Sequence, residues 1–319
     1  MPLTRRAVLG VVAAGLLRPA LAADTWRMVT EYPATTIPGE GIASFAATVA
    51  RLSDGGLVVQ PGFDGLRSAA MMEAVAAGEI DAADAFTGAL AAKAPILQLS
   101  ALPFLTASLA DTGRLLAAAR PAYVATLAAR GLSLLYATPW PASGIWSRRP
   151  LPDAASLQGL RIRTYDAAGT AVFQAAGAAP VQVSFADAMP RLRSGELDAV
   201  LSSGDGGAGA RLWELLPNFT VLDYASPLSL AFCRAAVRQA LPEATRRAID
   251  QAADETEARQ FRAMTTRNTE NETRMRSNGV SITTAPELRA KLVDAAGPVI
   301  AEWRSRAGTE AGAALDAYR

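Results

Sequence analysis

A short phrase that occurs twice constrains the fold of this chain more than any other feature of its sequence. Ala77–Ala82 reads AGEIDA and Ser194–Ala199 reads SGELDA. In both copies a helical pattern precedes the glycine, which can end a helix, and an apolar strand pattern follows. We interpret the aspartates of the two copies, Asp81 and Asp198, as local capping or pairing groups. Two copies of one helix–turn–strand unit predict two lobes of similar topology.

Strand and helix patterns alternate in both halves of the chain, which is typical of an α/β fold with mixed or parallel sheets and helices on both faces. The expected strands are Trp26–Thr30, Leu57–Gln60, Ile80–Phe86, Leu132–Ala137, Gly144–Ser147, Val181–Ser184 and Leu197–Ser202. The expected helices are Gly41–Leu52, Ser68–Ala77 with Ser68 as N-cap, 110–119, 122–129 and Phe185–Arg193.

The chain of 319 residues is long enough for two lobes with separate cores. We expect lobe 1 to comprise residues 24–140, with a return after about residue 225, and lobe 2 to comprise residues 141–225. Residues 226–319 should supply a lobe-crossing strand, a long helix and the C-terminal helices. The long helix is predicted to begin at Pro242, to stop at Asn278-Gly279 and, being polar on most faces, to lie across both lobes.

Residues 1–23 have the pattern of an export signal that is removed from the mature protein. Arg5-Arg6 precede a short apolar stretch, Ala7–Leu17, and small residues follow near Ala22. The arginine pair favours twin-arginine export, although such pairs also open ordinary signals. No later segment is apolar and long enough for insertion into a membrane.

Composition excludes several classes of function. The net charge of +1 offers no electrostatic case for nucleic acid. Because the chain has no histidine, it can build no Ser-His-Asp or Cys-His pair and no zinc site that contains histidine. We therefore expect no catalytic residue, resident metal or cofactor, while a secreted enzyme using Asp or Glu alone stays an alternative. Cys233, the single cysteine, lies in an apolar run that predicts burial.

Gly159–Thr164, with the sequence GLRIRT, places an arginine at the end of a predicted strand. Open α/β sheets bind ligands at this end of their strands, and a guanidinium offers a planar fork of donors to a carboxylate. Arg161 and Arg163 share one face of the strand, and Ile162 takes the other. From the residues alone, Arg163 fits a ligand clamp and a solvated strand edge equally well.

The same segment resembles the periplasmic solute-binding proteins of TRAP transporters (tripartite ATP-independent periplasmic transporters). The resemblance runs from about Trp26 to Gly308 and includes GLRIRT, the Gly177–Val181 stretch and the SGELDAV run from Ser194. It implies a two-lobed periplasmic binding protein fold. It also implies that Arg163, the second arginine of the run, clamps the ligand carboxylate and that Arg161 lies on the surface.

The resemblance implies further ligand-binding residues. Ser202 stands where the family often has an asparagine, in a loop that also contains Asp205. Glu31 and Tyr32 end the first strand, at a position that often touches ligand in the family. Some members have a second arginine near Ser143, but this chain has no arginine between Ser143 and Arg148.

Aromatic residues are expected to line the cleft between the lobes: Trp140, Trp146, Phe86 and Tyr165. Trp140 and Trp146 are the expected walls, because a rigid indole covers much apolar area. The competing interpretation places both tryptophans in the lobe core beside the hinge. With one clamp and an aromatic wall, we expect an acid with a single clamped carboxylate and an apolar or aromatic remainder, rather than a small dicarboxylate.

The resulting hypothesis is a periplasmic protein that captures an organic acid and delivers it to the membrane subunits of a TRAP permease without performing chemistry. An extracytoplasmic organic-acid sensor and the binding component of another permease class remain open as alternatives.

Overall fold

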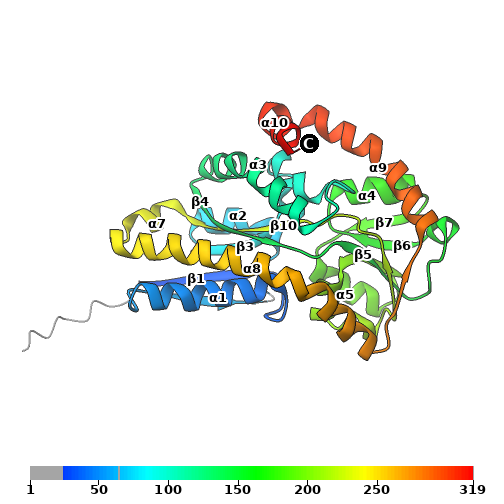
Figure 1. The fold of residues 1–319 in the computed structure, drawn as a ribbon, viewed down its shortest axis with the longest axis horizontal. Coiled ribbons are helices and arrows are strands. Elements are labelled where there is room, and N and C mark those ends of the chain that lie inside the picture. The colour runs from blue at the N-terminus through cyan, green and yellow to red at the C-terminus, as the bar shows by residue number, and fades with distance from the viewer. Residues whose placement is uncertain (1–23, 64, 319) are drawn as a thin grey trace, which may run out of the picture.

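A computed structural model describes residues 24–63 and 65–318. Two β-sheets lie side by side, each covered by helices, and a long helix runs from one lobe to the other (Figure 1). The predicted export signal, residues 1–23, lies outside the described residues. The predicted α/β fold with two lobes is confirmed. In the described part of the chain, no helix has the length and apolar character needed to cross a membrane.

The first sheet has the strand order β2-β1-β3-β10-β4. Neighbours β1–β2 and β1–β3 are parallel, with Met28 opposite Ala82, while β10 runs antiparallel to β3 and β4. Its strands are β1 (Asp24–Thr30), β2 (Leu57–Gly62), β3 (Ala82–Phe86), β4 (Leu132–Pro139) and β10 (Leu228–Arg234). Its helices are α1 (Ile37–Leu52), α2 (Ser68–Ala77) and α3 (Leu109–Ala128). Strand β10 brings the chain back to the first sheet after strands β5 to β9 of the second sheet.

The second sheet has the strand order β11-β9-β5-β8-β6-β7. Strand β6 pairs in parallel with β7 and β8, and β5 runs antiparallel to β8. Its strands are β5 (Ser143–Ser147), β6 (Arg161–Thr164), β7 (Ala179–Gln182), β8 (Ala199–Ser203), β9 (Asn218–Val221) and β11 (Ser281–Thr284). Its helices are α4 (Ala167–Ala175), α5 (Phe185–Arg193) and α6 (Gly204–Gly209).

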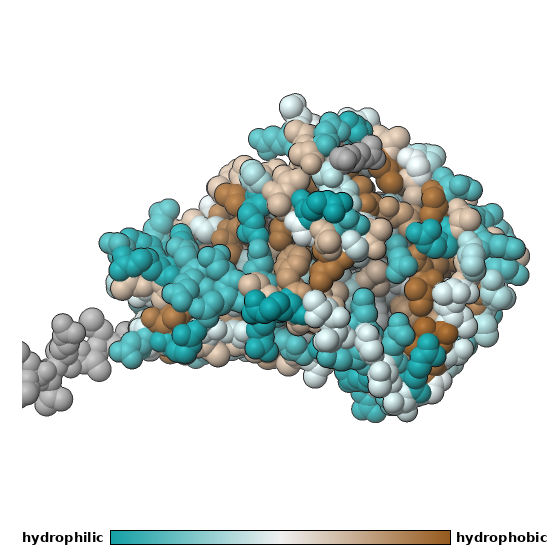
Figure 2. Space-filling model, in the orientation of Figure 1, coloured by the Kyte–Doolittle hydropathy of each residue, from teal (hydrophilic) through white to brown (hydrophobic). Residues whose placement is uncertain are grey.

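Helix α8 (Glu243–Ser277) connects the two lobes. It packs on α1 and β4 of the first lobe and on α6 of the second. It ends at Ser277 with Asn278 as the C-cap, and Gly279 follows with φ of 80°, the left-handed conformation that glycine adopts without strain. Hydrophilic residues cover α7 (Ala235–Ala240) and the first turns of α8 in Figure 2, as expected for a helix that is polar on most faces.

The last two helices return the chain to the first lobe. Helix α9 (Pro286–Arg306) packs on α4 of the second lobe, and α10 (Gly308–Tyr318) packs on α3 of the first. The chain therefore crosses between the lobes several times, which ties them together away from the cleft.

Three local predictions were wrong. Helix α3 is continuous through Pro121, where a break between two helices was expected. Arg67, not Ser68, is the N-cap of α2, and the carboxylate of Glu31 accepts a hydrogen bond from the Ser68 N–H. Strands β9 and β11 were not predicted; β11 has the sequence SITT, which lacks an apolar alternation, and it pairs only at the sheet edge with β9.

Candidate ligand-binding site

A cavity lies between the lobes, where strand ends from both sheets face each other. Tyr32 follows β1, Phe86 ends β3, and Arg163 and Tyr165 lie at the end of β6. Because β1 is parallel to β3 and β6 to β8, each lobe presents the carboxyl ends of its parallel strands to the cavity. The remaining lining residues are Trp140, Ser143, Phe185, Ser202, Ser203, Gly206 and Pro227.

Arg163 is the charged residue among those that line this cavity. The side chain is only 4% exposed. Its Nε donates to the Val183 carbonyl (2.9 Å) and its Nη1 to the Leu201 carbonyl (3.0 Å). Within the described part of the chain, Nη2 has no hydrogen-bond partner. The backbone therefore fixes the orientation of the fork and leaves donors for a carboxylate.

The environment of Arg163 is mostly apolar and aromatic. Its guanidinium carbon lies 5.8 Å from the ring centre of Tyr165 and 5.6 Å from that of Phe185. Burial lowers the pKa of Arg163, and the nearby acidic groups, with Tyr32 and Glu31 first, partly offset that effect. Charge pairing with a bound anion is strong in such a dry, low-dielectric environment.

Arg161 differs from Arg163 in every one of these respects. Its side chain is 50% exposed, and it makes a two-point ion pair with Asp198, with Nε–Oδ2 at 2.7 Å and Nη2–Oδ1 at 2.6 Å. This surface pair agrees with the structural role predicted for Asp198. Asp81 likewise acts locally, since its Oδ2 accepts from the Arg27 N–H at 2.8 Å.

Aromatic rings form the walls of the cavity. Tyr32 and Trp140 meet edge to face with ring centres 4.7 Å apart, and Phe86 meets Tyr165 in the same way at 5.1 Å. The indole Nε1 of Trp140 donates to the Ser229 hydroxyl at 3.0 Å, so the ring is fixed. Each of these pairs is worth about 0.5–1.5 kcal/mol beyond its buried area, which favours a preformed cavity.

The cavity has an inner and an outer chamber. The inner chamber, between Arg163, Trp140 and Ser202, has a volume of about 30 Å³, room for about one or two water molecules. The outer chamber has about 190 Å³ and shares Tyr32, Phe86, Arg163, Tyr165 and Phe185 with the inner one. A carboxylate fits the inner chamber, and the rest of an organic acid has to extend into the outer one.

Glu31 and Arg67 line the outer chamber. Oε2 of Glu31 accepts from the Ser68 N–H at 2.9 Å, while its buried Oε1 has no partner among the described residues. Arg67 donates from Nε (3.2 Å) and Nη2 (2.8 Å) to Oδ1 of Asp187, which belongs to the other lobe. This ion pair spans the mouth of the cleft.

The structure does not place Trp146 at the cavity. The side chain is fully buried, its Nε1 donates to the Ser203 carbonyl (3.1 Å), and its ring packs on Phe219 and against Gly207. Ser143, which does line the cavity, is three positions earlier on β5, and an odd separation puts two side chains on opposite faces of a strand. Trp146 thus belongs to the core of the second lobe, as the competing interpretation stated.

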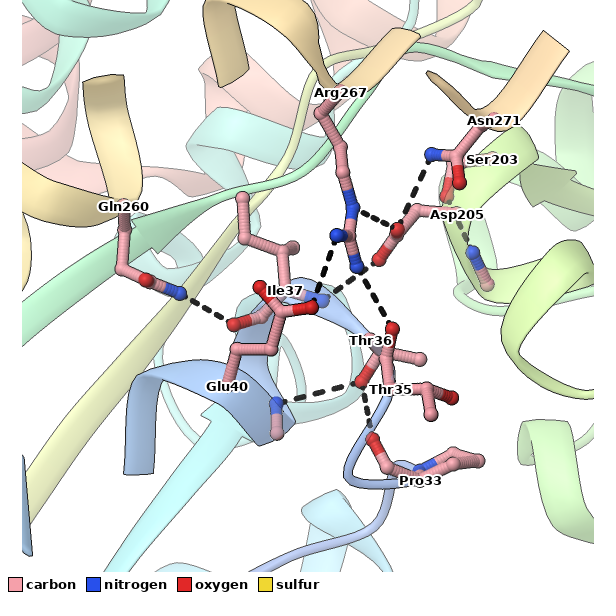
Figure 3. A network of polar contacts seen from close by, with 12 residues as sticks. Pro33, Thr35, Thr36, Ile37, Glu40, Ser203, Asp205, Gln260, Arg267 and Asn271 are labelled. Carbon is pink, nitrogen blue, oxygen red and sulfur yellow. Dashed lines mark hydrogen bonds and ion pairs between the residues drawn. The ribbon is translucent and has the colours of Figure 1, made fainter. Parts of the chain in front are cut away.

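Asp205 is also away from the cavity, in the polar network of Figure 3. Its Oδ1 accepts from Arg267 Nε (2.5 Å) and Asn271 Nδ2 (3.2 Å), both on α8. Its Oδ2 accepts from the Ile37 N–H (2.8 Å) at the start of α1 in the first lobe. Arg267 also reaches Glu40 and the Thr35 carbonyl, and Gln260 donates to the Ile37 carbonyl. The expected ligand contact is therefore an internal link between the lobes.

The lining residues that the sequence prediction did not name include Phe185, Ser143 and Arg67. Phe185 could have been found, because it begins the helix after β7, next to the end of β6 in the sheet. Arg67 had no such signal. The described residues contain no cluster of three or more acidic or cysteine side chains suited to a metal ion.

Comparison with known proteins agrees with this arrangement. The family described as bacterial extracellular solute-binding protein, family 7 (DctP) matches residues 28–306. A search of curated proteins gave no match.

Solved structures with the same fold include three proteins that bind pyroglutamate. DctP6 and DctP7 of Bordetella pertussis, extracytoplasmic solute receptors binding pyroglutamic acid, are each 26% identical to this chain, with TM-scores of 0.88 and 0.90. The matches cover 92% and 93% of this chain and 99% and 100% of those chains. A pyroglutamate-specific TRAP solute-binding protein from a marine metagenome is 28% identical, with a TM-score of 0.88 and coverage of 93% and 99%. With the family matched over most of its length, this chain belongs to the bacterial extracellular solute-binding proteins of family 7.

Proposed function

We propose that this protein captures a small organic acid through a single clamped carboxylate and delivers it to the membrane permease of a TRAP transporter. The observation that supports it most directly is Arg163, a buried guanidinium held by two backbone carbonyls, with a donor to spare, inside an aromatic cavity between two lobes. Organic-acid ligands of the related receptors agree with this chemistry.

The remainder of the ligand is expected to be compact and only weakly polar. The inner chamber is lined by Tyr32, Trp140 and Phe185 beside Arg163, and its other polar groups are serine and tyrosine hydroxyls. The second cation, Arg67, lies in the outer chamber and is already paired with Asp187. A second ligand carboxylate would have to displace that pair, so monocarboxylates should bind better than small dicarboxylates.

The function needs affinity and closure, not catalysis. When the lobes close, they exclude water from the Arg163–carboxylate pair and strengthen it. Asp187 and Asp205 are engaged in structural contacts, and Glu31 is engaged through one of its two carboxylate oxygens, so these groups give no support to an enzyme that uses acidic groups alone.

Arg163→Ala tests the clamp. We expect it to weaken carboxylate binding by about 2–5 kcal/mol, because the buried carboxylate loses its counter-ion. Arg163→Lys should not restore affinity, since an ammonium lacks the planar fork. Arg161→Ala is the matched control, two residues away on the same strand, and should have little effect.

The measurement is calorimetric titration of the mature protein with a panel of organic acids, chosen by a thermal-shift screen. Equal losses at the two arginines, or retention of affinity in Arg163→Ala, would reject the clamp. Uptake of the labelled acid by cells with and without the binding protein then tests delivery to a permease.

A further inference from the structure

Glu31 presents a buried acceptor that the protein itself does not use. The side chain is 5% exposed and follows directly on β1, at the wall of the outer chamber. One carboxylate oxygen, Oε2, accepts from the Ser68 N–H, which begins α2. The other, Oε1, is buried without a hydrogen-bond partner in the described part of the chain.

Such an atom calls for an explanation, because buried acceptors in native proteins are almost always satisfied by protein, water or ligand. Two arginines line the same chamber, yet Glu31 pairs with neither of them among the residues that the structure describes. Arg67 is held by Asp187, and Arg163 by the carbonyls of Val183 and Leu201. The cavity thus carries a spare donor on one lobe and a spare acceptor on the other.

We propose that Glu31 makes this protein select acids that carry a hydrogen-bond donor, an N–H or O–H group, in addition to the clamped carboxylate. The inference rests on the proposed carboxylate-binding function and names its specificity. Arg163 of the second lobe holds the carboxylate, and Oε1 of Glu31 in the first lobe accepts from the donor. A ligand with both groups therefore joins the two lobes.

Lactam, amino and hydroxy acids satisfy this requirement. Esters, ethers and keto acids of the same shape present only oxygen lone pairs to Oε1 and leave it unsatisfied. A second ligand carboxylate would place like charges together. The competing explanation is that Glu31 serves only to cap α2, in which case the ligand donor has no influence.

Matched ligand pairs separate these explanations. Pyroglutamate and 5-oxotetrahydrofuran-2-carboxylate differ in one ring position, N–H against O, and carry the same charge. Proline and tetrahydrofuran-2-carboxylate differ at the same position, but the ring nitrogen of proline is an NH₂⁺ group at neutral pH and adds a positive charge. In calorimetric titration of the mature protein, we expect the N–H member of a pair to bind about 10- to 100-fold more tightly, the range for a hydrogen bond to a charged group.

Glu31→Gln sharpens the test because it keeps an acceptor for the Ser68 N–H but offers the ligand a hydrogen-bond donor in place of an acceptor. The Ser68 N–H needs an acceptor, so the amide oxygen takes the place of Oε2 and the NH₂ group takes that of Oε1. The preference for the N–H member should then fall to about 1 or reverse. Glu73→Gln on α2, whose partner Lys93 lies outside the cavity, is the matched control and should keep the wild-type preference.

The inference would be overturned by equal affinity of the wild type for both members of each pair, or by an equal change for both members in Glu31→Gln. The same holds if acids without a donor bind tightly and none of the N–H members does. Arg163→Ala separates this failure from failure of the proposed function. If acids bind and that variant abolishes binding, the clamp stands even where the role of Glu31 is rejected.

Discussion

Two polar regions join the lobes, and they differ in how completely their charged groups are satisfied. Around Asp205, both carboxylate oxygens accept hydrogen bonds, and all three nitrogens of Arg267 donate to protein oxygens. In the cavity, Arg163 keeps a donor and Glu31 keeps an acceptor without protein partners among the described residues. Because unsatisfied buried groups cost free energy, the first region stabilises the protein and the second is suited to a ligand.

Trp146 supports both regions, and its removal should have the largest effect. Its indole fills the core of the second lobe and bonds to the carbonyl of Ser203, two residues before Asp205. Trp146→Ala should lower the free energy of unfolding of the unliganded protein by about 3–5 kcal/mol, the cost of a large buried cavity. Urea unfolding measures this. A variant of unchanged stability with weakened ligand binding would restore Trp146 as a cavity wall.

The Asp205 network should show a smaller loss that needs no ligand. Asp205→Asn keeps the size of the side chain but removes the charge opposite Arg267, and we expect a loss of about 1.5–3 kcal/mol in the free energy of unfolding. Asp198→Asn is the control, because its partner Arg161 is half exposed and such surface pairs contribute about 1 kcal/mol or less. Equal losses in the two variants, measured by urea unfolding, would contradict the contrast between a buried link and a surface pair.

The sequence predicted the order of strands and helices better than it predicted the contacts between side chains. The repeated Gly-Glu-(Ile/Leu)-Asp-Ala phrase and the alternating patterns located nearly all strands of both sheets, because the periodicity of buried residues is a local property. Strand β11 was missed, since a polar edge strand carries little periodic signal. Helix α3 is continuous through Pro121, because its packing on β4 and α10 outweighs the backbone hydrogen bond that a proline cannot donate.

Side-chain partners distant in the sequence were harder to predict. Arg163 was placed at the cavity because its position at a strand end is a local feature. Asp205 was misplaced because its partner Arg267 lies 62 residues away, and nothing in the loop sequence indicates it. Trp146 could be assigned to the core only once the structure showed that Ser143, three positions earlier on β5, faces the cavity.

The smallest effect is expected from the exposed ion pair between Arg67 and Asp187, a third link between the lobes. Its side chains are 38% and 51% exposed, so solvent screens the pair and we expect Arg67→Ala to weaken ligand binding by no more than about 1 kcal/mol.

The hydrogen bonds from Arg67 lower the pKa of Asp187, so the contribution of the ion pair is present above the ordinary carboxyl pKa and is lost as the pH falls through the lowered value. The difference in affinity between wild type and variant should therefore be constant from about pH 5 to 8 and shrink in 1 M salt. Calorimetric titration at low salt and in 1 M salt checks this, with Asp187→Asn as the matched variant. A loss that exceeds that of a typical surface pair, or that salt does not reduce, would show that Arg67 binds the ligand directly and belongs with Arg163.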